Sequence, residues 1–204
     1  MKKYLLIIML ICTPLFANTE YNLNYKLISD TQKIGTMKVV CVNTQNIYTY
    51  TTSVNIKFKY LFSSHTYTYK EIAKVKEGKI LSLEIFEDDD GKVSHTKAKR
   101  DKSYLIYEDG KSVDLREIDY LPFDIRAKGL SKYLNDKTFK LITFDPQSAQ
   151  KVFEKYTLSD NSNNFFSYEV LTNDELEMKT FNQDNILIYA KNKWFETVLL
   201  DIPQ

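Results

Sequence analysis

The side chains of this sequence that could perform chemistry are few, and their spacing does not build a reaction site. There are two histidines, His65 and His95, whereas a zinc site needs three or four clustered ligands. Ser63 and Ser64 directly precede His65, but neighbours on a strand point to opposite faces, so adjacency does not pair a nucleophile with its base. The sequence predicts no metal site and no serine nucleophile.

The densest acidic run is Glu87-Asp88-Asp89-Asp90-Gly91. Clustered carboxylates can bind calcium, yet an EF-hand loop ends with a glutamate at its twelfth position, and counting from Asp88 that position holds Lys99. We therefore interpret the run as a solvated hairpin turn. The five glycines of the chain form no phosphate loop or dinucleotide-binding motif, so we expect no cofactor and no enzymatic activity.

An alternation of apolar and polar residues with period two runs through the chain and predicts strands. Odd positions are apolar in Tyr21–Leu27, and even positions are mostly apolar or aromatic in Ile47–Leu61. The second run is longer than a usual strand of about five to six residues. Such a strand must curve or belong to a large sheet.

Short turn signals separate these runs and predict antiparallel pairing. A glycine in the turn accepts the positive φ that a tight hairpin requires, and strands joined so closely cannot be parallel. Between Tyr21 and Leu115 we therefore expect a meander of seven or eight strands, with turns at Glu77-Gly78, Asp89-Asp90-Gly91, Asp101-Lys102 and Asp109-Gly110.

The second half of the chain is interrupted before its strands resume. The segment Asp124–Asn135 has the spacing of a short helix, and we interpret it as a connector or lid. About twelve strands against one helix leave an apolar sheet face uncovered unless the sheet folds over. We predict a mainly β fold, a single strongly curved antiparallel sheet that forms an unclosed barrel or a folded-over sheet. The later strands are expected at Thr138–Phe144, Lys151–Leu158, Phe165–Leu171, Leu176–Phe181, Ile186–Ala190 and Trp194–Ile202.

Residues 1–17 have the layout of a cleavable signal peptide. Two lysines open it, Tyr4–Ile11 is an unbroken apolar run too short to span a bilayer, and Ala17 offers a small residue for cleavage before Asn18. We expect export to the periplasm, with residues 18–204 folding as a single antiparallel β domain.

Cysteine and charge exclude other classes of protein. Ile11 is bulkier than the small residue that precedes a lipid-modified cysteine, which argues against lipoprotein anchoring at Cys12. Without the leader, Cys41 is the one cysteine left, so no internal disulfide can form and we expect a buried small side chain. The 28 basic and 27 acidic residues give no basic face for nucleic acid, and no second apolar run is long enough to cross a membrane.

Several short stretches span most of the expected domain: Tyr25–Ile28 with Lys33–Met37, Phe58–Phe62 with Lys76–Leu81, Asp90–Lys92, and the turn Asp184-Asn185 before Thr197–Leu200. In this order they resemble a family of uncharacterised exported bacterial proteins with a domain of unknown function. The resemblance implies a strongly curved antiparallel sheet, similar to the unclosed barrels that carry lipoproteins or lipids across the periplasm. It implies no catalytic or binding residues.

Aromatic strand faces are the remaining feature from which a function can be inferred. Tyrosine has an apolar body and a polar tip, which suits the lining of a ligand cavity, although the same faces could pack as a closed core. We predict a non-catalytic protein that holds a lipid or another hydrophobic molecule in a β-lined cleft. The predicted lining consists of Tyr48, Tyr50, Val54, Ile56, Phe58, Tyr60, Tyr67 and Tyr69.

Two other interpretations remain open. A sheet edge could accept a strand of another envelope protein, as in a structural or assembly factor. An outer-membrane barrel also has alternating strands, but its outer loops are long whereas those expected here are short. Glutamates that interrupt the apolar faces also argue against a lipid-facing barrel; they include Glu71, Glu154 and Glu169.

Overall fold

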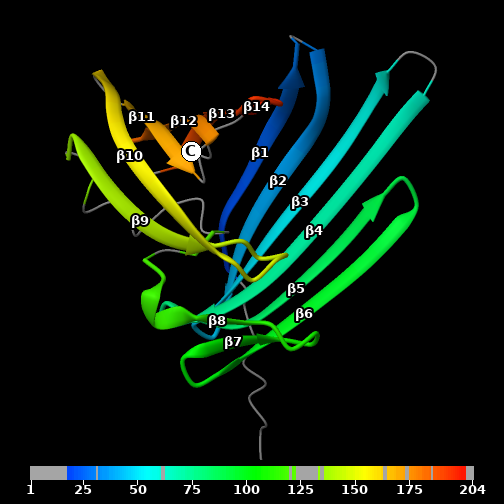
Figure 1. Cartoon of the computed structure of the whole chain (residues 1–204), viewed down its shortest axis with the longest axis vertical. Coiled ribbons are helices and arrows are strands. Elements are labelled where there is room, and N and C mark those ends of the chain that lie inside the picture. The colour runs from blue at the N-terminus through cyan, green and yellow to red at the C-terminus, as the bar shows by residue number, and fades with distance from the viewer. Residues whose placement is uncertain are drawn as a thin grey trace, which may run out of the picture.

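The protein, a computed structural model, forms one antiparallel sheet that curls into a nearly closed barrel (Figure 1). The structure describes residues 18–30, 32–60, 63–119, 121–122, 133, 136–162, 165–172, 175–184 and 186–200, without the side chains of Asn18, Tyr60 and Ser162. The predicted fold class, a single strongly curved antiparallel sheet, is confirmed. The predicted leader at residues 1–17 and most of the predicted lid at Asp124–Asn135 lie outside the described residues.

The first part of the chain is a meander of eight strands, as the alternation and the turn signals predict. Gly78, Gly91 and Gly110 lie in its hairpin turns with φ of +71°, +85° and +87°, a conformation that costs glycine little. The strands are β1 (Asn18–Ser29), β2 (Gln32–Thr44), β3 (Ile47–Tyr60), β4 (Ser63–Lys76), β5 (Lys79–Asp89), β6 (Lys92–Asp101), β7 (Tyr104–Tyr107) and β8 (Ser112–Asp114).

The second part adds six strands after a single turn of 3-10 helix, η1 (Leu115–Glu117). The described chain thus has fourteen strands rather than about twelve, because stretches as short as β7 and β8 carry too little alternation to be counted with assurance. The later strands are β9 (Thr138–Phe144), β10 (Lys151–Ser162), β11 (Phe165–Thr172), β12 (Glu175–Asn182), β13 (Leu187–Lys191) and β14 (Glu196–Leu199).

The barrel is joined at one place and left with a seam at another. β1 pairs with both β2 and β14, so the two parts of the chain share one sheet, and β8 and β9 are its edges. The backbone N–H of Asp119 donates to the carbonyl oxygen of Ile142 at 2.8 Å, and the Asp119 carboxylate accepts the N–H of Ile142, also at 2.8 Å. These two hydrogen bonds of Asp119 resemble the pairing of two strands and connect the two sides of the seam.

Two apolar clusters pack on the concave side of the sheet. The larger joins β1–β8 and includes Leu23 and Tyr25, both fully buried, together with Phe144 from the end of β9. The smaller lies within β9–β12 around Tyr156 and Tyr168. Cys41 of β2 is 1% exposed within the larger cluster, which confirms the prediction of a buried small side chain.

No helix in the part of the chain that the structure describes has the length and hydrophobicity of a membrane span.

Candidate functional site

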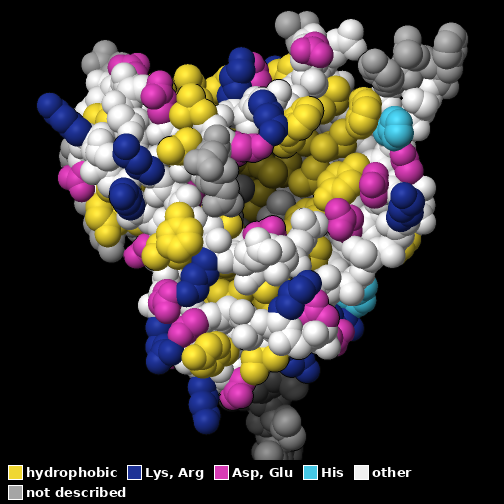
Figure 2. Space-filling view, in the orientation of Figure 1, with side chains coloured by type: hydrophobic (Ala, Val, Ile, Leu, Met, Phe, Trp, Pro, Cys, Tyr) yellow, Lys and Arg dark blue, Asp and Glu magenta, His cyan; other side chains and the backbone are white. Residues whose placement is uncertain are grey.

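The concave side of the barrel contains a hollow with a hydrophobic floor and acidic side chains at its rim (Figure 2). Strands β1–β4 lie behind this hollow (Figure 1). Strand register identifies one row of residues that faces it, because paired residues project from the same face of a sheet. The row begins at Tyr25, which is fully buried, and continues through Met37, Val54, Tyr69 and Glu87.

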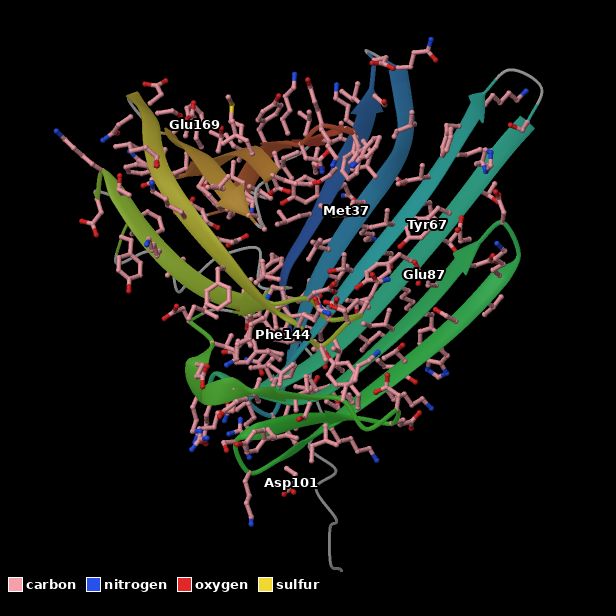
Figure 3. The ribbon with its side chains drawn as sticks, in the orientation of Figure 1. Met37, Tyr67, Glu87, Asp101, Phe144 and Glu169 are labelled. Atoms are coloured by element: carbon pink, nitrogen blue, oxygen red, sulfur yellow. The ribbon has the colours of Figure 1, made fainter. Side chains whose placement is uncertain are left out.

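Exposure along this wall decreases from an open rim to a closed floor. At the rim, Phe58 is 42% exposed and stacks on His65 with ring centroids 5.2 Å apart. Tyr67 is half-buried and lies on the same side of the sheet as Met37 and Glu87, all labelled in Figure 3. At the floor, Tyr50 is 5% exposed. The hollow is therefore open at one end and packed at the other.

The residues predicted to line a ligand cleft share this face, since β3 contributes its even positions and β4 its odd positions. Val54, Ile56 and Tyr67 are half-buried towards the open end. Tyr50 packs beside Tyr21 at the floor, with ring centroids 6.4 Å apart, and Tyr48 packs against the same cluster. The side chain of Tyr60 lies outside the described residues. Whether these side chains contact a ligand stays a prediction.

A buried glutamate lies on the same wall, between the open hollow and the packed floor. Glu71 is 5% exposed and accepts a hydrogen bond from the Tyr69 hydroxyl at 2.6 Å. Burial raises the pKa of the Glu71 carboxyl to about 7; the Tyr69 hydrogen bond opposes this shift, and the nearby Asp145 charge adds to it. Burial and the Glu71 charge raise the pKa of Tyr69 in turn.

The turn between β9 and β10 reaches across the concave side towards β4 (Figure 1). Asp145 caps this turn, accepting hydrogen bonds from Gln147 N at 2.8 Å and from Ser148 Oγ at 2.8 Å. Burial and a hydrogen bond to Glu87 raise the pKa of Tyr67 to about 12, while a hydrogen bond with Gln147 opposes that shift. The turn thus brings a carboxylate and an amide to the inner wall.

The hydroxyl of Tyr107 is a buried polar group on this wall that has no hydrogen-bond partner in the described part of the chain. Tyr107 of β7 is 2% exposed, and its buried Oη has no hydrogen-bond partner. Strand register continues from Ala73, two residues after Glu71, through Leu83 and Ala98 to Tyr107. Burial raises the pKa of Tyr107, and the charges of Asp145 and Glu71 raise it further. We call these three residues of the concave side the polar region.

A second buried glutamate lies in the other half of the barrel and is fully engaged. Glu154 is 5% exposed and accepts hydrogen bonds from Tyr156 Oη at 2.9 Å and from Lys179 Nζ at 2.9 Å. Lys179 also lies 3.6 Å from Glu177 and 5.7 Å from the centre of the Tyr156 ring. The arrangement stabilises a buried charge by pairing it.

The histidines and the hairpin residues Asp89 and Asp90 are exposed, as their sequence context predicts, whereas Glu87 at the start of the acidic run is half-buried on the inner wall. His65 Nδ1 lies 2.6 Å from Asp90 at the hairpin between β5 and β6, and His95 Nε2 lies 2.9 Å from Glu84. Thr66 and His65 hydrogen-bond to Asp90 and lower the pKa of its carboxyl. Within the described residues, no group of three or more histidine, cysteine or acidic side chains could hold a metal ion.

Sequence reasoning missed the polar region formed by Glu71, Tyr107 and Asp145. A signal for Glu71 was present, because it occupies an inward position in the alternation of its strand and follows Tyr69 by two residues. Tyr107 lies in a strand too short to assign a face, and the position of Asp145 depends on how a turn packs across the barrel. Neither the face of Tyr107 nor the position of Asp145 could be predicted from the local sequence pattern.

The outer surface also has grooves. One, of about 640 Å³, crosses the convex face of β4–β7 and is lined by several basic side chains, among them Lys74, Lys97 and Arg100. Another, of about 550 Å³, follows the seam edge near Ile142 and Phe153.

Comparison with known proteins finds a solved structure with a similar fold and identifies the family of this chain. The crystal structure of a β-barrel-like protein of the domain of unknown function DUF1849 from Brucella abortus matches with a TM-score of 0.62 and 10% sequence identity, over 90% of this chain and 97% of that one. At this identity the likeness concerns the fold alone. No curated protein matches the chain. The model of a domain of unknown function, DUF6134, matches residues 25–192, which confirms the resemblance to an uncharacterised family. This chain belongs to the DUF6134 family.

Proposed function

We propose that this protein is a non-catalytic binding protein that holds a lipid or another hydrophobic molecule in its hollow, and that it works in the periplasm after export. The observation that carries the proposal is the hydrophobic floor of an opening on the concave side (Figure 2). Half-buried Val54, Ile56 and Tyr67 provide the wall above the closed core.

Such a hollow needs no sequence motif to bind a long apolar chain. Each buried methylene contributes about 0.8 kcal/mol, so affinity accumulates along the chain without specific contacts. A contiguous apolar surface of this kind, rimmed by polar residues, is typical of ligand grooves. This explains how a function can exist in a sequence that has no recognisable reaction site.

Phe58 offers a direct test, because it stands at the rim and little of the fold depends on it. We expect Phe58→Ala to weaken the binding of the fluorescent apolar probe N-phenyl-1-naphthylamine several-fold. The free energy of unfolding should change by less than about 1 kcal/mol, since the side chain is 42% exposed and lies outside the buried core. Probe titration and urea unfolding of the same preparations measure the two effects.

Phe86→Ala is the matched control. Phe86 is 37% exposed and stacks on His95 with ring centroids 4.1 Å apart, much as Phe58 stacks on His65, but it lies on the convex face. Its substitution should leave probe binding unchanged. Equal effects of the two substitutions, or no saturable probe binding by the unmodified protein, would contradict a binding site in the hollow.

A second candidate function is docking of another envelope protein at the sheet edge. It is favoured by the seam, where β9 is an edge strand and the neighbouring outer surface exposes Phe153 at 60% and Leu176 at 62%. An extended segment could add a strand there. Co-purification of a stoichiometric protein, lost on substituting Lys140 of β9 with proline, would favour this candidate over lipid binding.

A further inference from the structure

Each half of the barrel buries one glutamate beside a tyrosine of the same strand, but only one of the two glutamates has a counter-ion. Glu154 accepts hydrogen bonds from Tyr156 and from the ammonium of Lys179. Glu71 accepts one from Tyr69, and no residue that the structure describes forms an ion pair with it. Both side chains are 5% exposed. The ammonium of Lys179, which pairs with Glu154, therefore has no counterpart beside Glu71 among the described residues.

The unpaired state of Glu71 is costly. A carboxylate taken out of water needs a partner charge or several hydrogen bonds, and the one hydrogen bond from Tyr69 occupies Oε2, with no described residue donating to Oε1. A buried carboxylate with one hydrogen bond and no described counter-ion indicates a partner that comes from outside the chain.

The position of this polar region suits the head group of an amphiphile. Above Glu71, towards the rim, the wall is apolar and half-buried at Val54 and Ile56. Below it, Tyr50 and Ala73 are buried in the closed core. A molecule that lies along the wall with its tail towards the rim would therefore bring its polar end to Glu71.

Building on the proposed function, we propose that the hollow selects amphiphiles whose polar end is a protonated amine, with Glu71 as the counter-ion. An ammonium carries three donors and no acceptor, which matches a carboxylate that accepts a single hydrogen bond from the described chain. The bound ammonium would form an ion pair with Glu71, as Lys179 does with Glu154.

A fatty acid would be disfavoured at the same place. Its carboxylate would approach Glu71, Asp145 and Glu87, and like charges at short range raise the free energy of the complex. The inward lysine of the other half, Lys179, is already engaged by Glu154 and Glu177. A preference for the amine over the acid would therefore distinguish this site from an apolar cavity without a head-group contact.

The test compares dodecylamine, dodecanoic acid and dodecanol as competitors of N-phenyl-1-naphthylamine, each below its micelle-forming concentration at pH 7.5. We expect the amine to bind at least about tenfold more tightly than the acid, with the alcohol between them, because a hydrogen bond to a charged group contributes about 1.5–3 kcal/mol. Glu71→Gln should remove most of this preference.

Two further variants separate the site from general charge and from folding. Glu84→Gln removes a carboxylate from the convex face of β5 and should leave the preference intact. Tyr107→Phe removes a buried hydroxyl that has no described partner, so both the fold and the amine preference should persist. Urea unfolding confirms that each variant is folded at the pH of the titration.

The outcomes distinguish this inference from the proposed function. Equal or tighter binding of the acid, or an amine preference that survives Glu71→Gln, would overturn the head-group assignment while binding of all three compounds would still support a hydrophobic site. Failure of the probe and of all three compounds to bind would overturn both.

Discussion

Glu71 is buried in a wall that is otherwise largely apolar, and its ionisation should lower the stability of the unliganded protein. Its pKa is raised from 4.5 to about 7, chiefly by burial, so the folded state retains a proton that the unfolded state has already lost. Between these two pH values the free energy of unfolding falls as the pH rises. At about 1.4 kcal/mol per pKa unit, the loss is about 3 kcal/mol once the pH exceeds 7.

Glu71→Gln removes this dependence while keeping an amide oxygen that can accept the Tyr69 hydrogen bond. We expect the variant and the unmodified protein to differ little near pH 4.5. Above pH 7 the variant should be more stable by about 3 kcal/mol. Urea unfolding across this pH range measures the difference, and the exposed carboxyls, including that of Asp90, cancel because both proteins carry them.

The control for this prediction is Glu84→Gln, on the exposed outer face. His95 and Lys97 lower the pKa of Glu84, so its substitution should, if anything, cost stability above the ordinary carboxyl pKa. A gain in stability at neutral pH for both variants, or for neither, would mean that the burial of Glu71 does not set its protonation.

The long strands β1–β4 owe their curvature in part to one glycine. Gly35 of β2 lies between Leu27 of β1 and Ile56 of β3, and a Cβ atom placed on it would stand 2.2 Å from the carbonyl oxygen of Asn55. Real side chains do not approach a backbone so closely, and the same place has an irregularity in the pairing of β1 with β2. Glycine therefore lets the backbones of β2 and β3 close on each other where the sheet bends.

Gly35→Ala should destabilise the barrel by about 1–3 kcal/mol, because the clash is with backbone that cannot rotate away. Thermal or urea unfolding measures this loss. Thr36→Ala, at the neighbouring outward position, should cost less than about 1 kcal/mol. If the two substitutions have equal effects, the close approach at Gly35 does not shape the sheet.

Most of the elements could be predicted from local pattern, and the polar site could not. Alternation located β1 and β3 because each of these strands has one wet and one dry face, and glycine turns such as Gly91 fixed the hairpins that follow. The polar region around Glu71 depends on a turn from β9–β10 that meets β4 across the barrel. Contacts between residues so far apart in sequence have no periodic signal.

At the scale of the whole molecule, the described residues form a sheet with too few helices to cover it, and the sheet curves over its own apolar face. Pairing of β1 with β14 joins the two halves, yet β8 and β9 remain edges that Asp119 bridges at one point. The family match and the shared fold with a DUF1849 protein describe this shape without naming a ligand. A nearly closed barrel with an apolar hollow is compatible with the binding of a hydrophobic guest that we propose.

Native mass spectrometry of the protein, purified gently from the cell envelope of its host without detergent exchange, tests this claim most directly. The mass should exceed that of the chain by a discrete amount that organic extraction removes, and the extract should contain the corresponding hydrophobic compound. A chain mass without any adduct, together with an extract free of lipid, would contradict a binding role for the hollow.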